Sequence, residues 1–180
     1  MEAVGDPFLR RHFASPKGNL YEAVASDFRP GWVHSFEAKN NKTSNDRGDL
    51  DRVVRALASQ DQMLERLSEE LDVDAFLNFW ATEVLIGHWD GFAGSQNNTF
   101  IYHDPQSDKF RFIAWGADST FGDQNVFTPY VPPDAVMANS RLSRQLYNHA
   151  ETREKYRQRM RGLLATVWKE RELEAEVDRI

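Results

Sequence analysis

The chain has 180 residues, 41% of them hydrophobic and 12% aromatic, which fits one globular domain with a real core. Its 22 basic and 28 acidic residues give a net charge of −6, which argues against a general nucleic-acid binder because phosphate contacts need a positive surface. It has no cysteine, so any metal must be held by oxygen or imidazole ligands. No run approaches the roughly 18 apolar residues of a membrane helix, and no targeting signal is visible.

The N-terminal part predicts one helix and a small β structure. Apolar residues recur at helical spacing up to about Ala14, and the turn-rich stretch SPKGN follows. Two short β-like segments, Leu20–Val24 and Val33–Lys39, are separated by Pro30 and Gly31, which favours a hairpin or extended flap. The polar stretch NNKTSNDRGD then predicts a surface loop.

Three helices are predicted next. Asp49 is a candidate N-cap for an amphipathic helix, and a second apolar-periodic run covers Met63–Leu71. Asp74 is a candidate N-cap for a third helix. Apolar residues cover more than half of the circumference of that third helix, so we expect it to be central and buried. These residues are Phe76, Leu77, Phe79, Trp80, Val84 and Leu85.

The rest of the chain predicts a β-hairpin and a helical end. The segments TFIY and KFRFIAW alternate as strands do, and HDPQSD between them is rich in turn formers. From Asn139 onward, apolar residues recur at three- and four-residue spacing with charges between them. The order of elements predicts an α+β fold dominated by helix, in a single domain whose parts are residues 1–48, 49–138 and 139–180.

The loop before the hairpin and the turn after it carry a group of polar residues. Because a hairpin returns its outer ends to one place, His88, Asp90, Asn97 and Asn98 must lie close to Asp118. Two carboxylates, two amides and an imidazole are a set that phosphoryl transfer uses. One carboxylate takes the proton of the attacking hydroxyl, and the other oxygens hold Mg²⁺ on the nucleotide phosphates.

The order of these residues matches that of protein kinases, which run a His-x-Asp loop, an Asn, a hairpin and an Asp. Asp90 precedes Asn97 and Asn98 by seven or eight residues rather than five, which predicts an atypical kinase. A metal-dependent phosphoesterase that directs the same carboxylates at water is an alternative.

Each residue also has a structural interpretation. Asp90 and Asp118 occur where ordinary turns use Asp, and the two Asn residues also suit a turn before a strand. His88 is expected to hold the loop by a hydrogen bond, with metal ligation as the other interpretation. A further polar group, Asp123, Gln124 and Asn125, is expected to be a solvated loop.

Four segments resemble the spore coat protein H (CotH) kinase family. They are GNLYEA, LDVDAFLNFWATEVLIGHWDG, NNTFIY and FIAWGADSTFG. The resemblance implies an atypical kinase fold, use of Mg²⁺ and ATP, and phosphorylation of Ser or Thr hydroxyls on protein substrates such as coat proteins. It implies that Asp90 is the catalytic Asp, assisted by His88, that Asn98 and Asp118 hold the metal, and that Asn97 contributes to nucleotide binding.

The resemblance also bears on the start of the chain and on its setting. The stretch MEAVGDPFLRRHF is similar to the segment that follows the N-terminal kinase lobe, which places Glu2 near the hinge as a nucleotide-binding residue. Gly5, Gly18 and Gly31 are isolated, so the first forty residues contain no Gly-rich phosphate loop. We therefore expect weak ATP binding. A non-catalytic scaffold module is the alternative function, and a bacterial spore coat or cell surface is the implied location.

Overall fold

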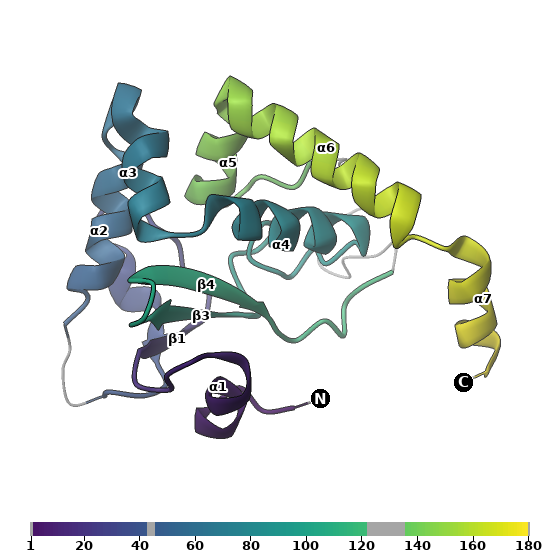
Figure 1. Ribbon diagram of the computed structural model, residues 1–180, viewed down its shortest axis with the longest axis horizontal. Coiled ribbons are helices and arrows are strands. Elements are labelled where there is room, and N and C mark those ends of the chain that lie inside the picture. Colours follow the sequence, from purple (N-terminus) through teal and green to yellow (C-terminus); the bar gives the residue numbers. More distant parts are fainter. Residues whose placement is uncertain (1, 43–45, 122–135, 180) are drawn as a thin grey trace.

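The computed structural model describes residues 2–42, 46–121 and 136–179. It confirms the α+β class: an antiparallel sheet lies among helices (Figure 1). The elements follow the chain as α1 (Asp6–His12), β1 (Asn19–Ala23), β2 (Glu37–Ala38), α2 (Gly48–Leu57), α3 (Met63–Glu70), α4 (Val73–Leu85), β3 (Thr99–Asp104), β4 (Lys109–Ala114), α5 (Arg141–Asn148), α6 (Ala150–Thr166) and α7 (Glu170–Arg179).

The sheet has four antiparallel strands in the order β2-β1-β3-β4. The expected hairpin is present, with β3 paired to β4 from Thr99 opposite Ala114 to Asp104 opposite Lys109. The predicted strand over Val33–Lys39 is mostly wrong. Its first three residues, Val33–Ser35, form a 3-10 turn, and only the two residues of β2 pair with β1.

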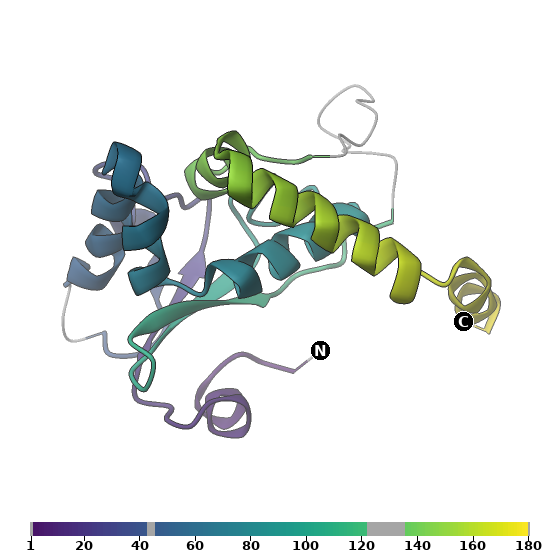
Figure 2. The same cartoon turned by 45° about the horizontal axis from the view of Figure 1, so that its top comes forward.

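Both faces of the sheet are covered, because alternate residues of a strand point to opposite sides. On one face α1 packs Leu9 against Leu20, Phe100 and Tyr102. On the other face Ile101 belongs to the main core, which lies under helices α2 to α6 (Figures 1 and 2). This two-sided burial explains why β3 contains almost no exposed residue.

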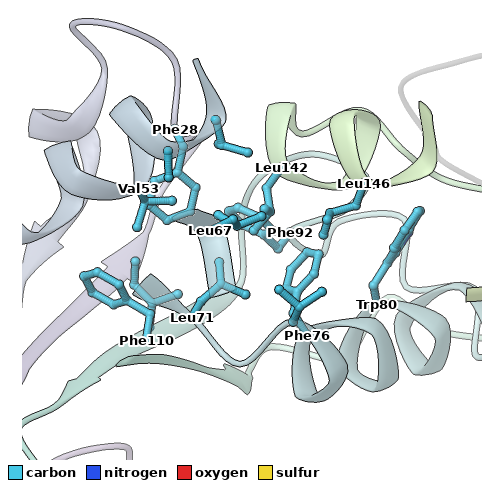
Figure 3. Close-up of a cluster of buried hydrophobic side chains, with 14 of the residues drawn as sticks. Phe28, Val53, Leu67, Leu71, Phe76, Trp80, Phe92, Phe110, Leu142 and Leu146 are labelled. Carbon is cyan, nitrogen blue, oxygen red and sulfur yellow. The ribbon is translucent and has the colours of Figure 1, made fainter. Parts of the chain in front are cut away.

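Helix α4 is the centre of the main core, as its composition predicted. Phe76 and Trp80 are buried on it, and Figure 3 shows both pointing into the apolar cluster. The Phe76 ring makes an edge contact with Phe112 of β4 at a centroid distance of 4.7 Å. On the next turn, Trp80 stacks on Tyr156 of α6 at 4.0 Å. The C-terminal helices are thereby joined to the same core as the sheet.

Two predicted helix caps differ from the structure. The cap of α4 is Asp72 rather than Asp74, and its carboxylate accepts a hydrogen bond from the Ala75 N–H at 2.9 Å. Helix α2 begins after Arg47, and Asp49 lies inside its first turn. The Asp49 carboxylate accepts hydrogen bonds from the Tyr21 hydroxyl and from Asn19, so tertiary partners occupy it.

None of the helices in the described part of the chain is both long and apolar enough to cross a bilayer. Helix α7 projects from the end of α6, away from the sheet (Figures 1 and 2). All of its described side chains are exposed.

The buried aromatic cluster supplies a stability prediction. Phe76 is 1% exposed and contacts several rings, so Phe76→Ala leaves a cavity between α4 and β4. We expect a loss of about 3–5 kcal/mol in the free energy of unfolding, measured by urea denaturation. The control Phe121→Ala removes a ring that is 67% exposed and should change stability by less than about 0.5 kcal/mol. Equal losses in the two variants would contradict the assignment of Phe76 to the core.

Candidate functional site

The base of the β3–β4 hairpin brings together the two segments that carry the predicted site residues. Thr99 pairs with Ala114 at the last register position of the hairpin. Asn97 and Asn98 directly precede β3, and Asp118 lies four residues after β4. The predicted hairpin is therefore confirmed at this end of the sheet, and the convergence of the site residues on Asp118 stays a prediction.

Asp90 is bonded to both asparagines. The Asn98 Nδ2 donates to Asp90 Oδ2 at 2.6 Å, and the Asn97 Nδ2 lies 3.4 Å and 3.5 Å from the two carboxylate oxygens. The Asp90 side chain is half-buried, on the turn that follows α4. The loop and the start of β3 are thus joined through one carboxylate, which has a short bond on Oδ2 and only a long contact on Oδ1.

The strand on the other side of the hairpin also reaches Asn98. Gly116 has φ +57°, and a Cβ placed on it would lie 2.8 Å from Cγ and from Oδ1 of Asn98. Asn98 itself has φ +47°, a left-handed conformation that Asn adopts more readily than most residues. The close approach of the Gly116 backbone to the Asn98 side chain favours a residue without a side chain at position 116.

Asp118 lies in the exposed turn after Gly116. This turn is attached to the end of α4, because the Phe121 N–H donates to the Ile86 carbonyl at 2.8 Å. Asp118 and Asp90 are both near enough to His88 to favour its charged form. Both carboxylates therefore act electrostatically on the same imidazole.

His88 is buried, with 1% of its surface exposed. Burial lowers its pKa, and this effect exceeds the opposite effects of the Gly116 backbone, Asp90 and Asp118. No hydrogen bond of standard geometry reaches its Nε2 from the described residues. The ring is therefore buried beside the loop, and its expected role of holding the loop by a hydrogen bond stays a prediction.

Glu83 was missed by the sequence analysis, although it organises this loop. It is 2% exposed on α4, and its two carboxylate oxygens accept the Phe92 and Ala93 N–H groups at 3.0 Å each. His88 Nδ1 lies 3.7 Å from its Oε1. A Cβ at Gly91 would fall 2.3 Å from that same oxygen, so the loop wraps closely around the acid.

Burial raises the pKa of Glu83 to about 7, and the hydrogen bonds from Ala93 and Phe92 act in the opposite direction. The acid within the apolar run TEVLIG was the available sequence signal, because an ionisable residue on an otherwise buried helix needs partners. Its partners lie nine and ten residues along the chain, which helical spacing does not indicate.

Glu2 lies apart from this group. It is exposed and forms an ion pair with Arg11 of α1, the helix that covers the other face of the sheet. Its nucleotide-binding role stays a prediction. The polar residues Asp123, Gln124 and Asn125 lie outside the described residues.

The donor chemistry at the hairpin base fits Mg²⁺. Asp90, Asn98 and Asp118 offer carboxylate and amide oxygens, and the Asn98 Nδ2 faces Asp90, which leaves Oδ1 for a cation. The described residues contain no cluster of three or more His, Cys, Asp or Glu side chains that would hold a metal alone. The set therefore suits an ion that takes further ligands from phosphates and water, as Mg²⁺ does.

A second polar cleft lies at the opposite end of the hairpin. Its volume is about 410 Å³, and Tyr21, Asp49, Arg52 and His103 are among its lining residues. None of the predicted site residues lines it. Several of its charged groups already have partners: His103 lies 3.7 Å from Asp49 across the cleft, and Arg52 pairs with Glu70 outside its lining at 2.7 Å.

The fold and the site define an α+β domain with an acid and amide cluster at the base of a β-hairpin. Residues 1–180 match the family described as CotH kinase protein, and the chain belongs to that family. Three similar proteins come from the fungus Rhizopus delemar. Invasin CotH7 is 33% identical over 96 residues, which are 47% of this chain and 16% of the invasin.

The other two relatives are similar over a slightly longer stretch. Spore coat protein homolog 1 is 30% identical over 112 residues, covering 58% of this chain and 18% of that protein. Invasin CotH2 is 28% identical over 117 residues, covering 58% of this chain and 20% of that protein. The aligned region is thus a small part of each relative, and the expected bacterial setting stays a prediction because these relatives are fungal.

The buried acid supplies a pH prediction. Because the pKa of Glu83 is higher in the folded chain, its contribution to stability is complete below about pH 4.5 and is lost as pH rises through about 7. We expect the free energy of unfolding of the wild type, taken relative to Glu83→Gln, to fall by up to about 3 kcal/mol from pH 5 to pH 8. His88 is common to both proteins, so its titration largely cancels.

Urea denaturation at each pH measures this difference. The matched control Glu69→Gln changes an exposed acid on α3 and should reproduce the wild-type profile. A constant difference between wild type and Glu83→Gln over this range would show that the buried carboxyl does not titrate there.

The contact between Gly116 and Asn98 supplies a second prediction. Gly116→Ala puts a methyl group against the Asn98 amide and forces a left-handed alanine, so we expect a loss of about 1–2 kcal/mol in stability. The Asn98 side-chain amide resonances should also shift in an NMR spectrum. Gly162→Ala on α6 meets no atom within 4 Å and should be neutral or stabilising by up to about 1 kcal/mol. If Gly116→Ala behaves like this control, the close approach does not constrain the site.

Proposed function

We propose that the chain is the catalytic part of an atypical protein kinase that transfers the γ-phosphoryl group of ATP to Ser or Thr hydroxyls of a protein. One observation carries the proposal: Asp90 is bonded to Asn98 at 2.6 Å at the base of the β3–β4 hairpin, whose second strand ends four residues before Asp118. This is the order and grouping of acid, amide and second acid that phosphoryl transfer needs. Membership of the CotH kinase protein family supports it.

Asp90 is proposed as the residue that positions the acceptor hydroxyl. Asn98 holds Oδ2, so the carboxylate presents Oδ1, which has only the long contact from Asn97. The hydroxyl oxygen attacks the γ-phosphorus, its proton passes to Asp90, and the bond to the leaving ADP breaks. Glu83 and His88 lie on the buried side of the loop, where they hold it in position and do not contact the substrate.

Asn98 and Asp118 are proposed to hold the Mg²⁺ that accompanies ATP. When bound, Mg²⁺ neutralises negative charge on the phosphates. Because Asn98 also bonds Asp90, the same side chain sets the spacing between the metal position and the acceptor hydroxyl. Asn97 is proposed to assist nucleotide binding from the adjacent position.

A non-catalytic binding module is the second candidate. The observation that favours it is that the Asp90 carboxylate is already occupied within its own loop, by Asn98 at 2.6 Å and by Asn97 at 3.4 Å. Such a module would keep the loop network around Asp90 as a structural feature. In either case we propose an assembly at a spore coat or cell surface as the setting, in line with the names of the relatives.

Two substitutions separate the proposed roles. Asp118→Asn should weaken Mg²⁺-dependent ATP binding and lower phosphotransfer together, because a metal ligand acts on bound ATP before and during the reaction. Asp90→Asn should leave Mg²⁺-ATP affinity nearly unchanged and reduce phosphotransfer by about 10²-fold or more. Calorimetry measures the affinity, and transfer of label from γ-labelled ATP to Ser- and Thr-containing peptides measures the rate.

The matched control is Asp108→Asn, an acid at the opposite end of the same hairpin, which should leave both readouts unchanged. Wild-type transfer by Asp90→Asn would show that Asp90 is not catalytic. Mg²⁺-ATP binding without any transfer to peptides would favour the binding module, and release of free phosphate without label on peptide would favour a phosphoesterase.

A further inference from the structure

The end of the molecule formed by α6 and α7 exposes a group of large apolar side chains. Leu164 and Val167, near the end of α6, are 48% and 64% exposed. Leu173 and Val177, one turn apart on α7, are 37% and 72% exposed. Figures 1 and 2 show α6 running along α4 to its C-terminal end, and α7 projecting beyond α4 and the sheet. A gathering of exposed apolar residues on two adjacent elements is typical of an interface.

The two helices have opposite charges. Helix α7 carries five acidic and two basic side chains, a net charge of −3. Helix α6 carries five basic and two acidic side chains, a net charge of +3. Each helix also places its charges beside its apolar residues. Glu170 precedes Leu173 by three residues and Glu174 precedes Val177 by three, so each glutamate lies next to an apolar side chain on the surface of α7.

The charged and apolar residues of α6 share one face. Arg157, Arg161 and Leu164 follow one another at four- and three-residue spacing, so their side chains lie in a row along the helix. All three are exposed. Arg161 also lies 3.6 Å from Glu154, but this pair is exposed and can exchange for another partner. The row therefore presents two guanidinium groups and one leucine, which complements the glutamates and apolar residues of α7.

Within one chain, α7 does not pack along α6, so neither helix covers the exposed apolar and charged side chains of the other. Only Val167, Trp168 and Lys169 join them, and α7 turns away from α6 instead of folding back along it (Figure 1). Pairing between two α7 helices is disfavoured, because each carries a net charge of −3. The basic row on α6 of another molecule has the complementary charge.

We propose that the chain forms a two-fold symmetric dimer in which α7 of each copy packs on α6 of the other. Leu173 and Val177 cover Leu164, while Glu170 and Glu174 face Arg157 and Arg161. The contact occurs twice, since a two-fold axis repeats every interface on both subunits. The proposal concerns assembly and does not depend on the phosphotransferase function.

Two charge-reversal variants test the proposal. The first is Glu170→Arg with Glu174→Arg, and the second is Arg157→Glu with Arg161→Glu. Each homodimer would bring like charges together, so we expect each variant alone to be a monomer. A one-to-one mixture should form a heterodimer, because both of its interfaces again join opposite charges.

Sedimentation velocity at protein concentrations from about 1 to 200 µM measures the assembly. We expect the wild type to dimerise within this range. Its dimerisation should be at least tenfold weaker at about 500 mM than at about 50 mM NaCl, because salt screens the charge pairs. The apolar part is tested by Leu173→Ser with Val177→Ser, which should weaken dimerisation at least tenfold. Val24→Ser is the matched control. It removes a side chain that is 52% exposed away from α6 and α7 and should have no effect.

The proposal is overturned by a wild type that stays monomeric at 200 µM, or by charge-reversal variants that still dimerise alone. It is also overturned if the mixture of the two variants fails to assemble. Normal dimerisation of the α6 variant would instead indicate pairing between α7 helices. All substituted side chains are exposed, so an unchanged melting temperature confirms that each variant is folded.

Discussion

The pairing of β3 with β4 is the constraint on which the rest of this structure depends. It places Phe112 against Phe76 of the central helix, and it also brings Asn98 and Gly116 to the same end of the sheet. A slip of one residue in this register would reverse both faces of the strands. It would expose the core aromatics and separate the two halves of the site at once. Core packing and site geometry are therefore specified by one set of backbone hydrogen bonds.

The loop between α4 and β3 has no regular backbone pairing of its own, so it needs a further interaction to hold it in place. Glu83 supplies it by accepting two loop N–H groups from a position inside the core. Burying a carboxyl is unfavourable unless it is hydrogen-bonded or protonated. Burial therefore disfavours the charged form of Glu83 and raises its pKa. The same loop carries the half-buried Asp90. A buried acid thus fixes the loop in which Asp90 is bonded to the two asparagines.

Family membership and site geometry support a common interpretation, in which the hairpin base is the functional centre. The family match covers the whole chain, whereas the named relatives align with it only over short segments of much longer proteins. The proposed dimer uses α7 and the exposed face of α6, and the joint between these helices lies close to the site. Trp168 contacts Phe121, three residues after Asp118, at a ring-centroid distance of 6.1 Å. Assembly through α6 and α7 would therefore take place beside the turn that carries Asp118.

The sequence by itself determined the α+β class, the central buried helix, the β3–β4 hairpin and the proximity of Asp90 to the asparagines. These features follow from local periodicity, turn residues and the return of a hairpin, all of which are written within a short stretch of chain. Only the tertiary structure decided where Asp49 and Glu83 find their partners, that Asp72 rather than Asp74 caps α4, and that Val33–Ser35 turns instead of extending. For Asp49 and Glu83 the reason is distance along the chain. A carboxylate is bonded by whichever donors the fold brings to it, and sequence spacing does not encode those donors.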